Sequence, residues 1–273
     1  MDVLQNARHR THRRGLSDQS RGRALCGSCA ADQPHSGRQH SVFPIGTSAY
    51  TAGSAQAAAG VQAAAAGPHC YAATAYLRKR CIHPNVLSFC KQKKILYQTS
   101  IKNHPNCVFV GRDGEGQAKG GSLRGCGAHQ FRRDIPGSRK IYPFYIEAAA
   151  ETDTVEVYEA PIDAMSGASL RILQHNGNWH SVHYLALGGT GYAALDAYLT
   201  YFPNIQRVVL CLDNDEAGRT RTQEITKHLA GSGKTVQDRA PPLGKDYNDT
   251  LVQFTQEFRQ RCMTLDDILE ESR

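Results

Sequence analysis

Three acidic clusters stand where predicted strands run into turns, and their side chains are of the kind that binds divalent cations. The clusters span residues 159–163, 213–215 and 246–249. Runs rich in Val and Leu at 155–158 and 208–212 precede the first two clusters and read as buried strands. Because the carboxyl ends of parallel strands meet at one edge of a sheet, we expect these carboxylates to converge there. Their mutual repulsion favours a hard cation, so the pattern predicts magnesium chemistry on phosphate.

Each carboxylate has an expected role in such a site. Asp213 and Asp215 stand two residues apart at a strand end, where a turn lets both side chains face one Mg²⁺ ion. Glu159, on a neighbouring strand, would act as a general acid or base or would share a metal ion. Asp163 follows one helical turn later and would support the site from behind these ligands. Mn²⁺ is expected to substitute for Mg²⁺, since both prefer oxygen ligands.

The third cluster would hold a second ion through Asp246 and Asp249. Asp215 and Asp249 could instead have a purely structural role, because both are well placed to cap the starts of helices. Capping alone does not explain why all three clusters fall at one predicted edge of the sheet. Metal binding therefore remains the main prediction for these residues.

The basic residues near the clusters predict contacts to nucleic-acid phosphates. Lys245 lies in the third cluster, Arg219 follows the second, and Arg124 belongs to the preceding segment. The whole chain has a formal net charge of +7 and a pI of about 8.9, a bias that suits a DNA or RNA partner. The chain has no apolar run of about 18 residues, so we expect no membrane span. Nine irregularly spaced cysteines and no apolar signal-peptide core indicate reduced thiols in a cytoplasmic protein.

Residues 1–69 differ from the rest of the chain. No Lys precedes Lys79 and no Glu precedes Glu115, and an Ala-, Gly- and Gln-rich run fills residues 52–67. With few large apolar residues, this leader cannot offset its chain entropy, so we expect a disordered low-complexity segment. An organellar transit peptide or a misassigned start of the reading frame would also explain its composition. Its CxxC pair at 26–29 has no histidines at zinc-finger spacing, and zinc is not expected.

A small α+β domain of unknown function is expected at residues 70–150. Short helices are predicted at 74–80 and 83–90, a strand at 106–113 and a returning strand at 121–125. The basic residues of this segment would line a nucleic-acid groove or form a solvated basic face, and the sequence favours neither.

Residues 151–262 are predicted to form an α/β domain. Val- and Leu-rich strands alternate with helical segments, as in a parallel four-stranded sheet with helices on both faces. The predicted strands are 155–160, 182–187, 207–213 and 235–240, and the helices lie near 162–174, 191–202 and 216–230. Residues 263–273 are expected to form a helical tail.

At these residues the chain resembles the Toprim family, which is shared by topoisomerases, bacterial primases and some nucleases. The family carries a glutamate after its first strand and Asp-x-Asp after its third, and Glu159 and residues 213–215 match these features. Four stretches are similar to family motifs and stand in the family's order: 159–166, 187–190, 212–219 and 244–249. One departure is Ala160, where many members have glycine. The stretch 212–219, which contains the Asp-x-Asp, is close to the form found in primases.

The preceding segment resembles a domain found before Toprim in bacterial mobile-element proteins, on the evidence of residues 108–113 and 122–125. The two resemblances imply a Mg²⁺-dependent, primase-like nucleotidyltransferase in replication or mobilisation of a plasmid or mobile element, with replication or relaxase proteins as partners. A metal-dependent nuclease and a non-catalytic nucleic-acid-binding accessory protein are the alternatives. A topoisomerase would need a tyrosine nucleophile on a large gate domain, for which the chain has no room.

One short motif imitates a nucleotide-binding loop. Residues 231–235 read Gly-Ser-Gly-Lys-Thr, but a P-loop needs another glycine at the position of His228. The segment also leaves a predicted helix and enters a strand, which is the reverse of a P-loop. We therefore expect a glycine helix stop and no ATP P-loop here.

Overall fold

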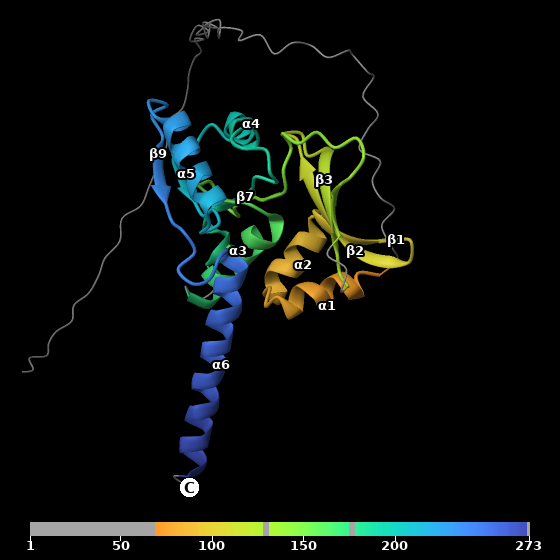
Figure 1. The fold of residues 1–273 in the computed structure, drawn as a ribbon, viewed down its shortest axis with the longest axis vertical. Helices are drawn as coiled ribbons and strands as arrows, with labels where there is room; N and C mark the ends of the chain where they lie inside the picture. Colours follow the sequence, from red (N-terminus) through yellow and green to blue (C-terminus); the bar gives the residue numbers. More distant parts are fainter. Residues whose placement is uncertain (1–68, 128–130, 175–177, 272–273) are drawn as a thin grey trace, which may run out of the picture. The chain divides into compact units, whose positions relative to one another are not determined.

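The computed structural model describes residues 69–127, 131–174 and 178–271, with side chains described as far as residue 260. The expectations for residues 1–68, including the disordered leader and its CxxC pair, lie outside the described residues. The described elements form two sheets with associated helices (Figure 1). Among the described helices, none is long and apolar enough to cross a bilayer.

The first sheet follows two short helices, α1 (Tyr71–Lys79) and α2 (Pro84–Gln92). Pro84 occupies the first turn of α2, and the His83 side chain accepts a hydrogen bond from the Asn85 backbone N–H, which caps this helix. Four antiparallel strands come next in the order β1-β2-β3-β4. Their bounds are β1 (Leu96–Ile101), β2 (His104–Arg112), β3 (Ala118–Gly125) and β4 (Arg132–Asp134). Lys102 and Asn103 both have positive φ, as a two-residue type I′ hairpin between β1 and β2 requires.

The second sheet has the order β5-β7-β6-β8-β9. Four of its strands are parallel, as predicted, and they are β6 (Thr154–Tyr158), β7 (His183–Ala186), β8 (Arg207–Leu210) and β9 (Thr235–Asp238). The strand β5 (Tyr145–Ile146), which the sequence did not predict, adds an antiparallel edge beside β7. The connecting elements are α3 (Pro161–Gln174), the 3-10 turn η1 (Trp179–Ser181), α4 (Ala193–Tyr201) and α5 (Glu216–Leu229). A single helix α6 (Tyr247–Glu271) ends the described chain.

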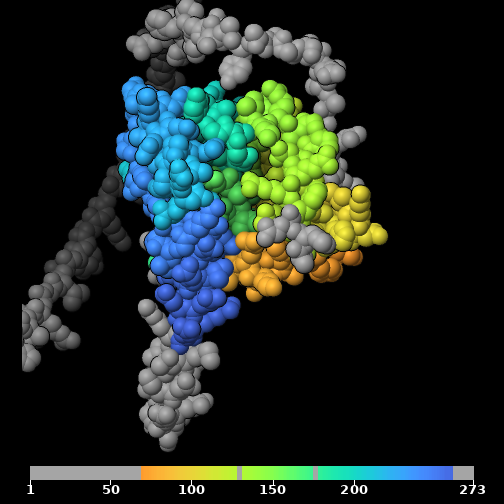
Figure 2. Space-filling model, viewed as in Figure 1, coloured from red at the N-terminus to blue at the C-terminus, as the bar shows by residue number. Residues whose placement is uncertain are grey.

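The two faces of the second sheet belong to different cores. On one face, Val155, Val157, Leu185 and Leu210 pack with apolar residues of α4 and α5. On the other face, strand residues such as Tyr184 pack with α3 and the start of α6. That second core continues without interruption into α1, α2 and β1. Both faces are therefore covered, as the apolar strands require, and the space-filling view shows the segments of the two sheets in contact (Figure 2).

A crossing segment before β5 ties the two sheets together. Gly111 of β2 bridges to Phe144, and a Cβ at Gly111 would come within 1.9 Å of the Tyr142 carbonyl oxygen. Phe144 packs edge-on against Phe109 of β2, with ring centroids 5.6 Å apart. Only glycine permits the crossing chain to lie this close to β2. The close packing fixes the position of the first sheet relative to the carboxyl edge of the second.

The Gly-Ser-Gly-Lys-Thr segment connects α5 to β9, in the helix-then-strand order that the sequence predicted. Gly231 and Gly233 both have positive φ, so they form a turn that ends the helix. The Lys234 ammonium group donates to the Ile205 carbonyl oxygen at 2.6 Å. This lysine therefore supports the amino end of the sheet, away from the acidic clusters.

Candidate metal and nucleic-acid site

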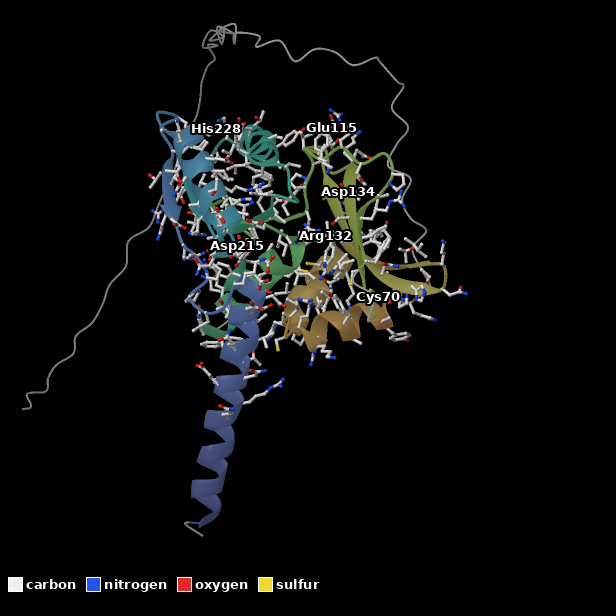
Figure 3. The ribbon with its side chains drawn as sticks, in the orientation of Figure 1. Cys70, Glu115, Arg132, Asp134, Asp215 and His228 are labelled. Atoms are coloured by element: carbon white, nitrogen blue, oxygen red, sulfur yellow. The ribbon has the colours of Figure 1, made fainter. Side chains whose placement is uncertain are left out.

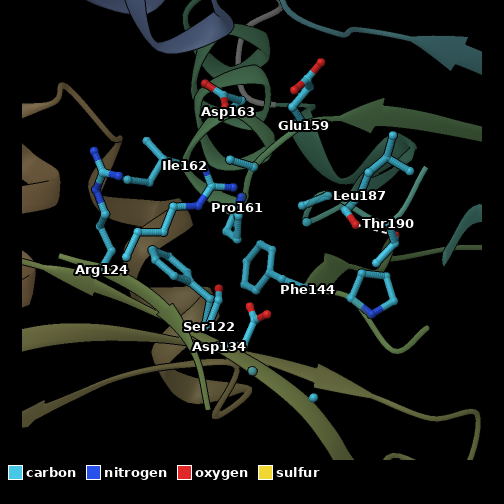
Figure 4. A pocket seen from close by; sticks show the side chains of 18 of the residues that line it. Ser122, Arg124, Asp134, Phe144, Glu159, Pro161, Ile162, Asp163, Leu187 and Thr190 are labelled. Atoms are coloured by element: carbon cyan, nitrogen blue, oxygen red, sulfur yellow. Dashed lines mark hydrogen bonds between the residues drawn. The ribbon is translucent and has the colours of Figure 1, made fainter. Parts of the chain in front are cut away.

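A cavity of about 610 Å³ lies between β3 and β4 of the first sheet and the carboxyl edge of the second sheet. Four carboxylates line it on the side of the second sheet: Glu159, Asp163, Asp213 and Asp246. Figure 4 shows Glu159 and Asp163 on this side, with Arg124 and Asp134 on the opposite side. The three acidic clusters thus each contribute to one cavity, as their placement at strand ends predicted.

Glu159 directly follows β6 and lies beside the glycine turn after β7. The Gly188 backbone N–H donates to the Glu159 carbonyl oxygen at 3.0 Å, which fixes the backbone at this point. The Oε1 atom of Glu159 is buried and has no hydrogen-bond partner among the described residues. A buried carboxylate oxygen without a partner costs free energy unless a donor or a cation satisfies it. This oxygen is the atom that a bound cation would contact.

Asp163 lies in the first turn of α3 and is only 7 % exposed. Burial, together with the neighbouring charges of Asp246 and Asp213, holds the pKa of the Asp163 carboxyl well above its usual range. The Asn248 backbone N–H donates to this carboxylate, and the Arg80 guanidinium lies nearby; both oppose the shift. Asp163 therefore lines the cavity from a nearly buried position, and its supporting role stays a prediction.

Asp213 follows β8 and has a side chain that is 18 % exposed. Burial raises the pKa of Asp213 to about 6, and the charges of Glu159, Asp246 and Asp215 add to the shift, while Lys245 opposes it. Repulsion of this kind arises only between carboxylates that lie near one another. Glu159, Asp213 and Asp246 thus form one electrostatically strained group, and we call these three residues the acidic triad.

Asp215 takes a different position from the triad. Its Oδ1 atom accepts a hydrogen bond from the Gly218 backbone N–H at 2.9 Å and caps α5. The Lys245 ammonium group lies 2.9 Å from Asp215 and 3.9 Å from Asp213. These contacts hold the pKa of the Asp215 carboxyl below its usual range, chiefly through the Gly218 N–H. The capping role considered from the sequence is thus present, and Asp215 does not line the cavity described above.

Asp249 lies in the first turn of α6, and its hydrogen bonds are made to the backbone there. The Asp249 backbone N–H donates to Asp246 Oδ1 at 2.7 Å, and Asp249 Oδ2 accepts from the Lys245 backbone N–H at 3.0 Å. The first bond makes Asp246 the N-cap of α6, and the second ties the Asp249 side chain to the loop before the helix. Gly244 precedes it with φ of +75°, and a Cβ there would lie 2.4 Å from Asp249 Cβ. Asp246 therefore reaches the cavity while Asp249 is held against the backbone.

The two loops that carry these carboxylates are joined to each other. The Asn214 backbone N–H donates to the Lys245 carbonyl oxygen at 2.7 Å. Asp213 and Asp246 therefore reach the cavity from loops whose backbones are hydrogen-bonded side by side. The sequence placed both clusters at strand ends but gave no signal for this contact.

The acidic triad fits a hard divalent cation by its donor atoms and its charge. All its ligand atoms are carboxylate oxygens, which Mg²⁺ and Mn²⁺ prefer, and one of them is buried without a partner. Among the described residues, no three His, Cys, Asp or Glu side chains already stand close enough to hold a metal ion. Magnesium commonly takes only one or two carboxylates and completes its octahedron with water and substrate phosphate. The triad is compatible with that mode of binding and not with an all-protein cage.

The predicted phosphate-binding residues fall into two groups. Lys245 and Arg124 line the cavity, and Arg124 Nε donates to the Tyr76 hydroxyl at 3.3 Å. Arg219 is occupied elsewhere: it forms an ion pair with Asp238 at 2.9 Å and donates to the backbone carbonyls of residues 212 and 213. Arg219 thus fixes the loop after β8, and its assignment to nucleic acid stays a prediction.

Further basic residues line the cavity on the side of the first sheet, and sequence reasoning missed them. Figure 3 labels one of them, Arg132, on β4, together with Asp134. The missed basic residues are Arg132, Arg133, Arg139 and Lys140, and together with the predicted Arg124 we call them the basic wall. The strand β4 has three exposed residues and no apolar pattern, so nothing in the sequence marked it as part of a sheet.

The comparisons with known proteins agree with this architecture. Residues 156–251 match the Toprim-like family model, and residues 75–149 match the model of a family described as a protein of unknown function, DUF3991. No curated protein matches the sequence significantly. The chain is therefore similar to Toprim-like proteins over residues 156–251 and to the uncharacterised DUF3991 family over residues 75–149.

Solved structures of primases are among those to which the chain is similar. The primase fragment of the bacteriophage T7 primase-helicase protein is 18 % identical, with a TM-score of 0.50 over 67 % of this chain and 71 % of that chain. The DnaG primase catalytic domain bound to ssDNA is 17 % identical, with a TM-score of 0.48 over 72 % and 75 %. The E. coli primase catalytic core is 16 % identical, with a TM-score of 0.46 over 67 % and 69 %. The first likeness shows that the described fold is similar to that of a primase fragment.

Proposed function

We propose that this protein is a Mg²⁺-dependent enzyme of nucleic-acid phosphoryl transfer, with primase-like, template-directed nucleotide incorporation as its reaction. The observation that carries the proposal is the buried, unpartnered Oε1 of Glu159, set among carboxylates that raise the pKa of Asp213. This group faces a cavity whose other side is basic. A cation held between the two would bring substrate phosphate to the acidic triad without repulsion.

The carboxylates at the cavity would have different roles in binding the cation. When bound, Mg²⁺ would neutralise phosphate charge and polarise the phosphoryl group, and Mn²⁺ would replace it. Glu159, Asp213 and Asp246 would supply the oxygen ligands, and Glu159 would also accept a proton from an attacking hydroxyl. Asp163 lies behind them as a buried carboxyl. Asp215 and Asp249 hold Lys245 and the backbone of the closing loop.

The basic wall would bind the phosphates of single-stranded DNA or RNA. Arg132 and Arg133 stand on β4, and Arg139 and Lys140 follow on the crossing segment. Lys140 also contacts Asp134 at 3.2 Å, an exposed pair that leaves the wall strongly positive. Each phosphate contact should lower the logarithm of the affinity by about 0.7 per unit of log salt on single strands.

Primase-like incorporation is favoured over nucleic-acid cleavage by the fold that the chain shares with a primase fragment. The paired resemblances found in the sequence support a role in replication or mobilisation of a plasmid or mobile element, in the cytoplasm, with replication or relaxase proteins as partners. We further propose that residues 70–150 and 151–262 act as two domains, followed by a helical tail at 263–273.

The experiment that tests the proposal measures two reactions side by side. Nucleotide incorporation on a single-stranded template and cleavage of single-stranded DNA are assayed with MgCl₂, with MnCl₂ and with EDTA. The wild-type protein should incorporate nucleotides only with a divalent cation. Glu159→Gln and Asp213→Asn should lower the rate by roughly two orders of magnitude or more, since such a metal contributes several kcal/mol to the transition state.

Glu224→Gln is the matched control for Glu159→Gln, because Glu224 is exposed on α5 and does not line the cavity. It should incorporate at the wild-type rate. Cleavage without incorporation would replace the primase proposal with a nuclease. Neither reaction in the presence of either cation would support a non-catalytic nucleic-acid-binding protein.

A further inference from the structure

Asn248 is a buried asparagine at the start of α6 whose amide contacts two other helices. Asn248 as a whole is only 4 % exposed. The Asn248 Nδ2 atom donates to the Arg80 carbonyl oxygen at 2.9 Å and to Ser166 Oγ at 3.0 Å. In return, Asn248 Oδ1 accepts a hydrogen bond from Arg80 Nη1 at 2.8 Å. One side chain therefore connects the end of α1, the middle of α3 and the first turn of α6.

The same residue also holds a carboxylate of the site. The Asn248 backbone N–H donates to Asp163, which lies one turn before Ser166 in α3. Ser166 Oγ donates to the Ile162 carbonyl oxygen at 2.8 Å, so its remaining capacity as an acceptor is directed at the Asn248 amide. Asn248 thus fixes Asp163 through its backbone and the helix that carries Asp163 through its side chain.

Arg80 is the partner on the side of the DUF3991 segment. It is the residue that ends α1, its guanidinium lies over the Tyr76 ring at 5.2 Å, and it lines the cavity. The Tyr76 hydroxyl also accepts a hydrogen bond from Arg124 of the basic wall. A chain of direct contacts therefore runs from the basic wall through Tyr76 and Arg80 to Asn248 and Asp163.

We propose that Asn248 and Arg80 are positioning residues which couple the DUF3991 domain to the acidic triad, by fixing Asp163 and α3 behind the triad. This inference rests on the proposed cation site and extends it to the regulation of that site. Groups that orient metal ligands from behind change metal affinity when they are removed, although they do not touch the metal. The affinity of the triad for a divalent cation therefore depends on a contact made by the preceding domain.

The test compares cation binding by three variants that conserve the net charge. Asn248→Ala removes the connecting amide, Ser166→Ala removes one of its acceptors, and Arg80→Lys keeps the positive charge but loses the planar Nη1 donor. Arg78→Lys is the matched control, because Arg78 is an exposed residue of the same helix. MgCl₂ and MnCl₂ are titrated into each full-length protein by calorimetry, with Asp213→Asn as a variant of the triad itself.

Folding is monitored separately so that a loss of stability is not mistaken for a loss of positioning. Trp179 is the single tryptophan of the chain, and it packs edge-on against Phe89 of α2 with ring centroids 5.5 Å apart. Its fluorescence therefore reports whether α2 still packs beside η1. All titrations are made at a temperature at which this signal and the circular dichroism show a folded protein. If Asn248→Ala is unfolded there, Ser166→Ala and Arg80→Lys decide the test.

We expect Asn248→Ala to weaken cation binding by roughly 10- to 100-fold. Ser166→Ala and Arg80→Lys should weaken binding in the same direction, and Arg78→Lys should match the wild type. Folded variants that bind Mg²⁺ and Mn²⁺ as tightly as the wild type would overturn the positioning role and leave the cation site standing. A wild-type protein that binds neither cation would overturn the cation site and the positioning role together.

Discussion

At the scale of single residues, the structure separates acidic side chains that look alike in the sequence. Asp213 and Asp246 line the cavity, although one Asp246 oxygen also accepts the Asp249 backbone N–H. Among the hydrogen bonds and ion pairs of the described residues, the oxygens of Asp215 and Asp249 contact only backbone N–H groups and Lys245. The sequence could predict that these loops converge, because the ends of the preceding strands could be recognised from their apolar runs. It could not predict which carboxylate turns inward, because that choice depends on side-chain rotamers and on caps that form only in the folded loop.

Asp213→Asn should stabilise the cation-free protein at neutral pH. Because the folded pKa of Asp213 is raised to about 6 from its ordinary value of 3.8, the favourable contribution of the protonated carboxyl to stability is complete below about pH 4. That contribution is lost as pH rises through about 6. In EDTA at pH 7.5, the variant should gain about 1–3 kcal/mol in free energy of unfolding, measured in urea. At pH 4 the two proteins should be nearly equal.

Asp215→Asn provides the contrast, because the pKa of Asp215 is lowered and its charge is favourable. That variant should be less stable than the wild type at pH 7.5. An Asp213→Asn effect of the same size at both pH values would show that the raised pKa is not its cause.

At the scale of elements, the parallel strands of the second sheet were predictable, whereas β1, β4 and β5 were not. The runs that became β6, β7 and β8 are mostly apolar and buried, so their positions could be predicted from the sequence. The strand β1 carries polar residues at 98–100, β4 is exposed throughout, and β5 has two residues, so each lacks an apolar period. Arg132 and Arg133 of the basic wall were missed together with β4, because this strand is held by its pairing with β3 and has no apolar pattern of its own.

A glycine in α5 sets the loop that presents Asp213. A Cβ at Gly218 would come within 2.0 Å of the Asp213 carbonyl oxygen. Gly218→Ala should therefore displace this loop and lower the free energy of unfolding by about 1–3 kcal/mol, with a loss of Mg²⁺-dependent activity. Gly127→Ala is the matched control, because a Cβ there meets no atom within 4 Å. Equal stability and activity of the two variants would show that the loop accommodates the methyl group.

At the scale of the whole described molecule, the cavity exists because two sheets share one core. The core that covers α3 and α6 also contains residues of α1, α2 and β1, and the crossing segment passes tightly over Gly111. Neither sheet alone would place positive charge opposite the acidic triad. The sequence favoured neither a nucleic-acid groove nor a solvated face for the basic residues, because the choice depends on this packing.

Removal of two charges from the basic wall should weaken nucleic-acid binding in a salt-dependent way. Arg132→Gln combined with Arg133→Gln should reduce the slope of log affinity against log salt by about 1.4 for single-stranded DNA, if each arginine contacts one phosphate. Arg207→Gln combined with Arg259→Gln is the control with the same change of net charge, because both arginines are exposed and neither lines the cavity. Fluorescence anisotropy across a salt series measures the slopes. Equal slopes for the two double variants would show that the basic wall is a solvated surface that does not bind nucleic-acid phosphates.

The central claim is that Glu159, Asp213 and Asp246 together bind a catalytic divalent cation. The most direct measurement is an anomalous difference map from crystals of the full chain grown or soaked in MnCl₂. We expect a manganese peak in the cavity between the two sheets, with oxygens of at least two of these three carboxylates at about 2.0–2.2 Å, near the distances that Mg²⁺ takes. A map with no peak in the cavity would contradict the claim, as would a peak held only by Asp215 and Asp249.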